Sequence, residues 1–234
     1  MMVLVAAGGA VLVAGAVLAS RGPFDNRSMN GLLSVVWMYA RLWHGLRVRG
    51  VANVPAAGPV IIAANHTTGL DPVLLQAGCP RLIRWVMLTS WRFRLLEPIW
   101  RRVQPICLDR GTRDVAGIRA IVRVLEQGEA VGLFPEGGLQ REARALNPFH
   151  PGIAMIARRS DAPIVPAWIE GTPRRRNMLW HFLQPSRSRV TFGQPYRPPA
   201  SWSRQQILDD LRQRMENLRL ATGQWERVTW QRTR

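Results

Sequence analysis

Short apolar runs of strand length alternate with runs of helical spacing through most of this chain, and that alternation constrains its fold more than any other feature. In the helical runs, apolar residues recur every three or four positions, as in a helix that covers a sheet. The alternation predicts a single layered α/β domain with a largely parallel central sheet flanked by helices. The expected strands are residues 60–64, 82–88, 105–108, 130–134, 164–169 and 189–192, and the expected helices between them are 72–77, 93–103, 114–127 and 152–159.

Two further helical patterns flank this core. The first covers residues 32–46, and its predicted apolar stripe consists of Leu32, Val35, Val36, Tyr39, Trp43 and Leu46. This pattern fits two settings, a core-facing helix or a helix that lies in a membrane interface. Trp37 and Trp43 within it, and Arg47 just after it, suit the second setting as well as the first. The second pattern covers residues 203–221 and predicts an amphipathic helix with one apolar stripe.

The first 20 residues of the chain contain no charged side chain. About 20 apolar residues can cross a bilayer as a helix. The alternative is a signal peptide cleaved after Val17-Leu18-Ala19, but no arginine precedes the apolar run as a signal peptide requires. Arg21 and Arg27 follow the run, and basic residues tend to stay on the cytoplasmic side. We therefore expect residues 1–22 to be an uncleaved membrane anchor.

The chain carries a formal net charge of +17 from 32 basic and 15 acidic residues, and its sequence contains arginine but no lysine. Such a charge predicts an anionic partner, which is a membrane surface, a nucleic acid or an acidic carrier protein. The sequence has no zinc-finger spacing and no RNA-binding aromatic signature, whereas ten Trp among many arginines suit a membrane interface. Cys79 and Cys107 lie in apolar stretches, as core residues of a reducing compartment do. Without a Cys/His cluster, no metal site is predicted.

A histidine and a carboxylate follow the first buried run. His66 comes just after residues 60–64, and Asp71 stands five positions further on. In open α/β sheets, ligands bind at the carboxyl ends of the strands, and an imidazole held by a carboxylate is a common general base. The alternative is structural, because Asp71 followed by Pro72 also has the pattern of a helix N-cap. His66 would then be an ordinary polar loop residue.

The N-H-x4-D pattern of residues 65–71 resembles the first motif of the glycerolipid acyltransferases, the 1-acylglycerol-3-phosphate acyltransferase family. Three further blocks follow in the family's order and approximate spacing. They are Ile-Cys-Leu-Asp-Arg-Gly at 106–111, Leu-Phe-Pro-Glu-Gly at 133–137 and Ile-Val-Pro-Ala at 164–167. The resemblance covers about residues 45–200.

This resemblance implies the transfer of a fatty acyl group from a thioester to a lipid hydroxyl. His66 would remove the hydroxyl proton, while Asp71 would fix the tautomer of the ring and stabilise the imidazolium. No nucleophilic Ser or Cys stands within the motif, so the alcohol would attack the thioester directly. The resemblance further implies that Glu136 and Gly137 bind the acceptor and that Arg110 contacts its phosphate, for which a guanidinium is well suited.

The third block departs from the family's usual E-G-T-R pattern. Leu139 stands where the family has arginine, and Arg141, five residues after Glu136, is the nearest replacement. The resulting E-G-x-x-x-R resembles a variant found in acyltransferase domains fused to lysophospholipid transporters. Thr89 also stands where the family often has lysine. We therefore expect Arg141 to bind the acceptor, and these departures leave open whether that acceptor is lysophosphatidic acid or another lysophospholipid.

Together these features predict a membrane-anchored O-acyltransferase of phospholipid biosynthesis, with its catalytic domain on the cytoplasmic side of the cytoplasmic membrane. Its acyl donor would be acyl-CoA or acyl carrier protein, and no cofactor is expected. The alternatives are an acyltransferase for a lyso-aminolipid, a catalytically silent lipid-binding protein and a basic nucleic-acid binder. The expected organisation is an anchor at 1–22, a linker and interfacial helix at 23–49, the acyltransferase domain at 50–200, and a C-terminal amphipathic helix and tail at 201–234.

Overall fold

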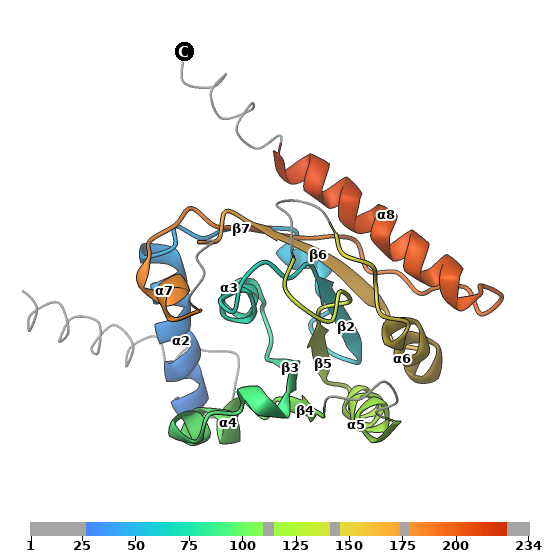
Figure 1. Cartoon of the computed structure of the whole chain (residues 1–234), viewed down its shortest axis with the longest axis horizontal. Coiled ribbons are helices and arrows are strands. Elements are labelled where there is room, and N and C mark those ends of the chain that lie inside the picture. Colours follow the sequence, from blue (N-terminus) through green and yellow to red (C-terminus); the bar gives the residue numbers. More distant parts are fainter. Residues whose placement is uncertain (1–26, 110–114, 141–145, 174–177, 224–234) are drawn as a thin grey trace, which may run out of the picture.

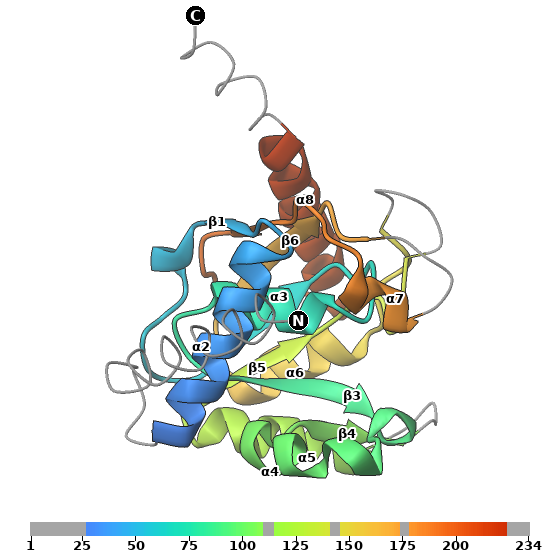
Figure 2. The same cartoon turned by 90° about the vertical axis from the view of Figure 1, so that its left-hand side faces the viewer.

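A mostly parallel sheet forms the centre of the computed structural model, which describes residues 27–109, 115–140, 146–173 and 178–223 (Figures 1 and 2). Its strands are β1 (Arg47–Arg49), β2 (Val60–Ala64), β3 (Ile83–Leu88), β4 (Ile106–Leu108), β5 (Ala130–Leu133), β6 (Ile164–Glu170) and β7 (Arg189–Phe192). The seven strands lie in the order β1-β7-β6-β2-β5-β3-β4. The strands from β6 to β4 run parallel, whereas β7 is antiparallel to β6. The predicted α/β domain with a largely parallel sheet is confirmed.

Helices cover both faces of this sheet. The α-helices are α2 (Arg27–Leu42), α3 (Asp71–Gly78), α4 (Glu97–Val103), α5 (Val115–Glu126), α6 (Gly152–Ser160), α7 (Met178–Leu183) and α8 (Arg204–Gly223), and the 3-10 helices are η1 (Val51–Asn53), η2 (Thr89–Trp91) and η3 (Arg94–Leu96). Helix α3, with α2 against it, lies on one face, and α5, α6 and α8 lie on the other (Figure 1).

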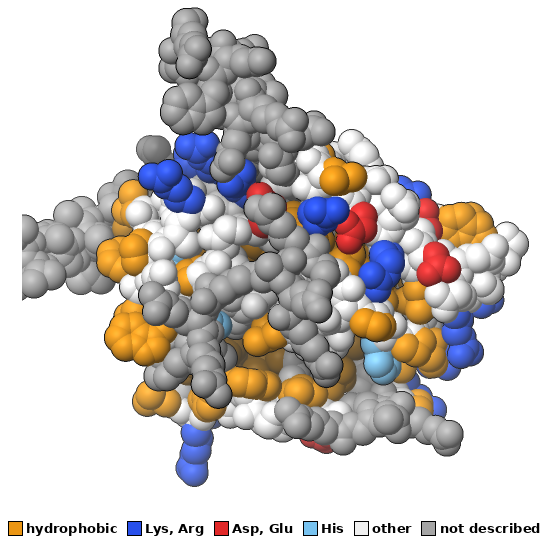
Figure 3. All heavy atoms as spheres, turned by 45° about the horizontal axis from the view of Figure 1, so that its top comes forward, with side chains coloured by type: hydrophobic (Ala, Val, Ile, Leu, Met, Phe, Trp, Pro, Cys, Tyr) orange, Lys and Arg blue, Asp and Glu red, His pale blue; other side chains and the backbone are white. Residues whose placement is uncertain are grey.

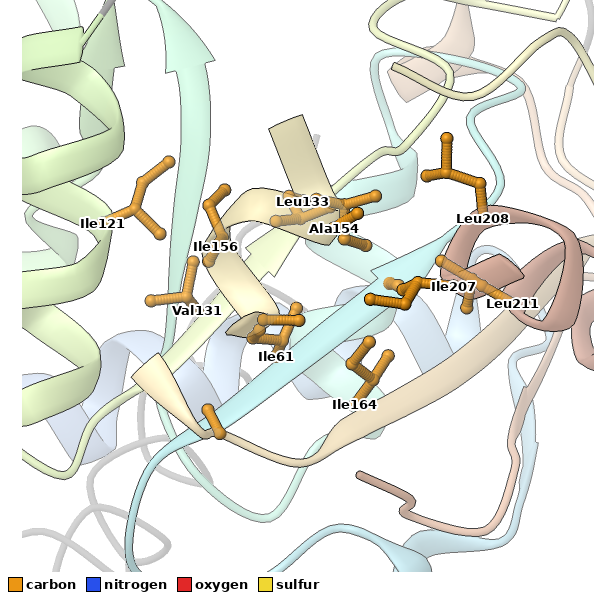
Figure 4. Close-up of a cluster of buried hydrophobic side chains, with 14 of the residues drawn as sticks. Ile61, Ile121, Val131, Leu133, Ala154, Ile156, Ile164, Ile207, Leu208 and Leu211 are labelled. Atoms are coloured by element: carbon orange, nitrogen blue, oxygen red, sulfur yellow. The ribbon is translucent and has the colours of Figure 1, made fainter. Parts of the chain in front are cut away.

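Successive side chains of the central strands point to opposite faces and so divide the core in two. In β2, Ile61 and Ala63 join the cluster beneath α5, α6 and α8, whereas Val60 and Ile62 join the cluster beneath α3. Figure 4 shows the first cluster, in which Ile61 of β2 lies between Val131 of β5 and Ile164 of β6. Because both faces are covered, the strands are apolar throughout, and this is why they appear in the sequence as continuous apolar runs.

The first described helix differs from the one predicted at residues 32–46. It ends at Leu42, and Gly45, with a φ of 47°, then turns the chain toward β1. Leu46 is buried after this turn, while Val35 of the predicted stripe is exposed on the helix. The predicted stripe therefore does not face the core as one surface, because the chain leaves the helix before the stripe is complete.

The structure extends the sheet domain beyond the expected residues 50–200 at both ends. Strand β1, which the sequence pattern did not reveal, lies within the stretch expected as linker and interfacial helix. At the other end, α8 buries Ile207, Leu211 and Met215 in the core. Strand β1 and helix α8 thus pack as parts of the α/β domain.

The helix predicted at residues 93–103 is divided into η3 and α4. Helix α4 begins at Glu97, and Pro98 occupies its first turn. Proline has no N–H to donate and is disfavoured inside a helix, but it is well tolerated in the first turn, where N–H groups need no helical acceptor. Pro98 therefore starts a new helix.

Within the described residues, no helix is long and apolar enough to cross a membrane. The anchor expected at residues 1–22 lies outside the described residues.

Candidate active site

The carboxyl ends of three neighbouring strands lead into loops that meet at one edge of the sheet. His66 follows β2, Glu136 follows β5, and Thr172 follows β6. β2 pairs in parallel with both β5 and β6, so all three loops leave the sheet on the same side. The topology thus brings His66 to Glu136, 70 positions away in the chain, and Thr67 to Thr172, 105 positions away.

The loop after β2 begins with a side chain that continues the sheet. Asn65 is fully buried, its Nδ2 donates to the carbonyl oxygen of Ile169 at 2.9 Å, and its Oδ1 accepts the N–H of Ile169 at 2.8 Å. These two bonds to one residue imitate a rung of backbone pairing. They hold β2 against β6 where the chain leaves the sheet, so the next residue, His66, starts from a fixed position.

His66 and Asp71 form a hydrogen-bonded pair in this loop, with Nδ1 of His66 at 2.9 Å from Oδ2 of Asp71. An ionised carboxylate can only accept hydrogen bonds, so in the neutral ring Nδ1 carries the proton and Nε2 keeps the lone pair. Among the described residues, Nε2 has no hydrogen-bond partner. The ring also stacks on Phe134, with centroids 3.8 Å apart and planes 10° from parallel. The hydrogen bond to Asp71 and the stacking on Phe134 together fix the orientation of the ring.

Asp71 is not the N-cap that the sequence offered as an alternative. Helix α3 begins at Asp71 itself, with Leu70 in the cap position. The carboxylate instead turns back to the loop before it. Its Oδ2 accepts the N–H groups of Thr67 at 2.5 Å and Thr68 at 2.7 Å, and its Oδ1 accepts their hydroxyl groups at 2.8 and 3.1 Å. Four donors besides the imidazole thus compensate a fully buried charge.

Glu136 holds the backbone of His66. Its Oε1 accepts the His66 N–H at 3.0 Å, and its Oε2 accepts the Asn147 N–H at 2.8 Å. Gln140 joins the same loops, because its backbone N–H donates to the His66 carbonyl at 2.7 Å and its Nε2 donates to Oε1 of Glu136 at 3.3 Å. Burial raises the pKa of Glu136, against the opposing effect of the N–H donors.

The other residues that the sequence analysis named differ in whether and where the structure places them. Arg110 and Arg141 lie outside the described residues. Gly137 is exposed and adopts a φ of 65°, a left-handed conformation that glycine allows in the turn after Glu136. The Thr89 hydroxyl donates to the carbonyl of Leu108 at 3.1 Å, so it joins the ends of β3 and β4.

The sequence analysis assigned no role to six residues of this site, which are Thr67, Thr68, Phe134, Gln140, Asn147 and Thr172. The two threonines lie between His66 and Asp71, so their place within the motif was a local signal. Asn147 and Thr172 had no such signal, because they reach the site only through the fold. The hydroxyl oxygens of Thr67 and Thr172 lie 2.7 Å apart.

The arrangement can perform proton transfer at Nε2 of His66, whose imidazolium the Asp71 carboxylate would stabilise. The hydroxyl groups of Thr67 and Thr68 are directed at that carboxylate and not at the His66 ring. Among the described residues, no group of three or more His, Cys, Asp or Glu side chains is placed to hold a metal ion.

Comparison with known proteins links this geometry to a family. The family model described as Acyltransferase matches residues 45–170, over half of the chain. The 1-acyl-sn-glycerol-3-phosphate acyltransferase of Bacillus subtilis is 27% identical over 129 residues, which are 54% of this chain and 63% of that protein. A probable 1-acyl-sn-glycerol-3-phosphate acyltransferase of Mycoplasma genitalium is 26% identical over 145 residues, 58% of this chain and 53% of its own. The chain thus spans less than two thirds of the length of either relative.

A solved structure shares the fold. It is the crystal structure of the 1-acyl-sn-glycerophosphate acyltransferase PlsC from Thermotoga maritima, with a TM-score of 0.66 and 19% identity. The match covers 90% of this chain and 86% of that one. At this identity the likeness speaks for the fold alone.

Proposed function

The chain belongs to the acyltransferase family, and from that premise we propose that it transfers a fatty acyl group from an acyl thioester to the free hydroxyl of a lysophospholipid, such as 1-acylglycerol-3-phosphate. The observation that carries the proposal is the pair of His66 and Asp71 at the carboxyl edge of the sheet, with Nε2 of the ring left as a base. The reaction would serve phospholipid biosynthesis, as the names of the relatives suggest.

In the proposed mechanism, Nε2 of His66 takes the proton of the acceptor hydroxyl as its oxygen attacks the thioester carbonyl. A tetrahedral intermediate forms, and Asp71 stabilises the imidazolium through its bond to Nδ1. When the intermediate collapses, the carbon–sulfur bond breaks and the sulfur leaves with the proton from His66. The products are a diacyl lipid and a free thiol, and the base returns to its starting state.

Glu136 has two roles in this proposal. Its carboxylate positions the base by accepting the His66 N–H. The sequence block at 133–137, which contains Glu136 and Gly137, forms part of the acceptor site. Arg110 and Arg141 complete that site as contacts for the acceptor's phosphate, for which the fork geometry of a guanidinium is well suited.

The proposed location is the cytoplasmic side of the cytoplasmic membrane. Residues 1–22 would be the anchor, and α2 would lie in the interface with Trp37 and Trp43 exposed to lipid. Arg21 and Arg27 after the apolar run support this orientation. The acyl donor is acyl-CoA or acyl carrier protein, and the thioester enters as a substrate.

The test supplies the purified full-length protein with an acyl thioester labelled in its acyl chain, presented as acyl-CoA and as acyl carrier protein in separate reactions. The acceptors are lysophosphatidic acid, other lysophospholipids and a lyso-aminolipid. We expect labelled diacyl product from a lysophospholipid, and much less product with His66→Ala. Product from the lyso-aminolipid alone would replace the proposed acceptor. Lipid binding without any product would indicate a silent lipid-binding protein, and preferential binding of nucleic acid would overturn the proposal.

A further inference from the structure

The segment between β3 and β4 exposes large apolar side chains that the protein itself does not bury. They are Trp91, Phe93, Leu95 and Ile99. Leu95 is 89% exposed, which is the largest exposed fraction of any large hydrophobic residue in the described part of the chain. Single exposed apolar residues are common on soluble proteins, but a contiguous group of them marks an interaction surface. This group is called the β3–β4 patch below.

Arginines alternate with the apolar residues of the β3–β4 patch. Arg92 and Arg94 stand beside Phe93, and Arg101 and Arg102 lie in the last turn of α4. Glu97 is the single acidic residue between positions 89 and 103, and both Arg92 and Arg101 pair with it, at 2.8 and 3.5 Å. The patch therefore carries a net positive charge, which complements a surface of anionic lipid headgroups.

The segment that carries the β3–β4 patch lies on the same side of the molecule as helices α2 and α7. Figure 2 shows α2, α4 and α7 on one face, and both cartoons place the beginning of α2 near α4. Figure 3 shows hydrophobic side chains along the left and lower-left margin, over the same region. The exposed apolar residues of these helices include Trp37 and Leu42 of α2 and Trp180 and Leu183 of α7. The apolar residues 1–20 precede α2 in the sequence.

The β3–β4 patch also lies at the edge of the sheet that carries the candidate site. Strand β3 pairs in parallel with β5, so the carboxyl ends of both strands point to the same edge. The patch begins directly after the end of β3, while Phe134 and Glu136 follow the end of β5. A surface that contacts the patch would therefore lie near the carboxyl ends of the strands, where His66 also lies.

We propose that the β3–β4 patch docks on a membrane that contains anionic lipid, as a second contact besides the N-terminal segment and α2. Its tryptophan and phenylalanine enter the interface, and its arginines contact the headgroups. The docked patch presents the carboxyl edge of the sheet to the membrane, where a lysolipid acceptor resides. The inference rests on the proposed function for its partner, but it concerns residues that take no part in the chemistry.

The test places an environment-sensitive fluorophore on position 95 of the full-length chain. The variant Leu95→Cys is labelled in a background in which Cys79 and Cys107 are replaced by Ala. The matched control is Leu220→Cys in α8, whose leucine is also exposed, at 56%. Vesicles are made of equal parts phosphatidylcholine and phosphatidylglycerol, or of phosphatidylcholine alone. On the anionic vesicles we expect the emission at position 95 to shift to shorter wavelength and to be quenched by spin-labelled lipid, while position 220 shows neither change.

The outcomes separate this inference from the proposed function. If the protein binds the vesicles while position 95 behaves like position 220, the docking patch is overturned but membrane association stands. If the protein binds no vesicles, the docking patch and the proposed membrane location both fail, whereas acyl transfer to a lysophospholipid is decided by the labelled product alone. A shift at position 95 without vesicles that grows with protein concentration would identify a second copy of the chain as the occupant. Hydrogen exchange of the unsubstituted chain gives an independent readout, because docking should protect the amides of residues 91–99 when anionic vesicles are added.

Discussion

The two carboxylates of the candidate site, Asp71 and Glu136, are held in different ways. One oxygen of Asp71 accepts the His66 ring and two backbone N–H groups, while its other oxygen accepts only the hydroxyls of Thr67 and Thr68. Glu136 accepts a backbone N–H on each of its oxygens, from His66 and from Asn147. Asp71 therefore holds the side chain of His66, and Glu136 holds its backbone.

This difference determines which of the two carboxylates can be replaced by an uncharged amide without loss of its hydrogen bonds. A hydroxyl can donate or accept, so an amide at position 71 can direct its oxygen at the N–H groups and its nitrogen at the hydroxyls. An N–H cannot accept, so an amide at position 136 must place one donor against another. The charge of Asp71 is thus separable from its structural role, whereas that of Glu136 is not.

The largest effect is expected when the base itself is removed. In His66→Ala the backbone N–H that Glu136 accepts remains, so the loop should stay in place while the proton acceptor is lost. Positioned general-base catalysis contributes about 10²–10⁴-fold, so kcat should fall by at least that range. Steady-state acyl transfer measures the loss, with His150→Ala as the control because His150 is an exposed loop histidine. Equal losses in both variants would remove the special role of His66.

Asp71→Asn should show the next largest loss of activity. The imidazolium loses its anionic partner, and a charge-assisted hydrogen bond is worth about 1.5–3 kcal/mol, so kcat should fall by about 10–10²-fold. The melting temperature should change little, because the amide satisfies the same donors. In contrast, Asp71→Ala leaves buried donors without an acceptor, at about 1–3 kcal/mol for each. If Asn and Ala destabilise the fold equally, the charge and structural role of Asp71 are not separable.

Glu136→Gln should mainly lower the stability of the fold, whereas Asp71→Asn should mainly lower activity. One N–H of His66 or Asn147 is left facing an amide donor, which costs about 1–3 kcal/mol of the free energy of unfolding. Activity should fall as well, because the His66 backbone is released. Urea unfolding of this variant beside Glu126→Gln, an exposed residue of α5, measures the difference. Equal stability of the two variants would contradict the contrast drawn between the two carboxylates.

A smaller effect is expected at Thr172, which acts on Asp71 through Thr67. The Thr67 hydroxyl gives its proton to Asp71, so Thr172 is the donor in the 2.7 Å contact between the two hydroxyls. Thr172→Val removes that donor at nearly constant volume and should lower kcat about tenfold or less, since such a bond is worth about 0.5–1.5 kcal/mol. Thr172→Ser should restore most of the rate. Equal rates in the Val and Ser variants would exclude this positioning role.

The smallest effect is a pH dependence of stability. Burial raises the pKa of Glu136, so the folded state still holds its proton at pH values where the unfolded chain has lost it. As pH rises from the ordinary glutamate value to the raised one, the contribution of Glu136 to the free energy of unfolding falls. The wild type should therefore lose more stability across this window than Glu136→Gln, as measured by urea unfolding at several pH values. Parallel curves would show that burial of Glu136 does not set the dependence.

The sequence by itself determined the α/β architecture and the place of His66. Burial on both faces makes a strand apolar throughout, so β2 and β6 were visible as local runs, and a histidine after β2 had to lie at the carboxyl edge of the sheet. The sequence left the role of Asp71 open between a cap and a partner of the base, because both roles need the same residue at the same spacing. It also missed β1, which has only three residues, two of them exposed arginines.

Only the tertiary structure decided how the site is held together. The bond from Glu136 to the His66 backbone, the stacking of Phe134 on the ring, and the contact of Thr172 with Thr67 all join loops of different strands. These contacts exist because β2 lies between β5 and β6 in the sheet. The spacing of apolar residues indicates which residues are buried, and it depends only on residues that are close together in the sequence. The order of strands is a property of the whole fold, so the partners of the loop after β2 follow from the fold and not from any local pattern.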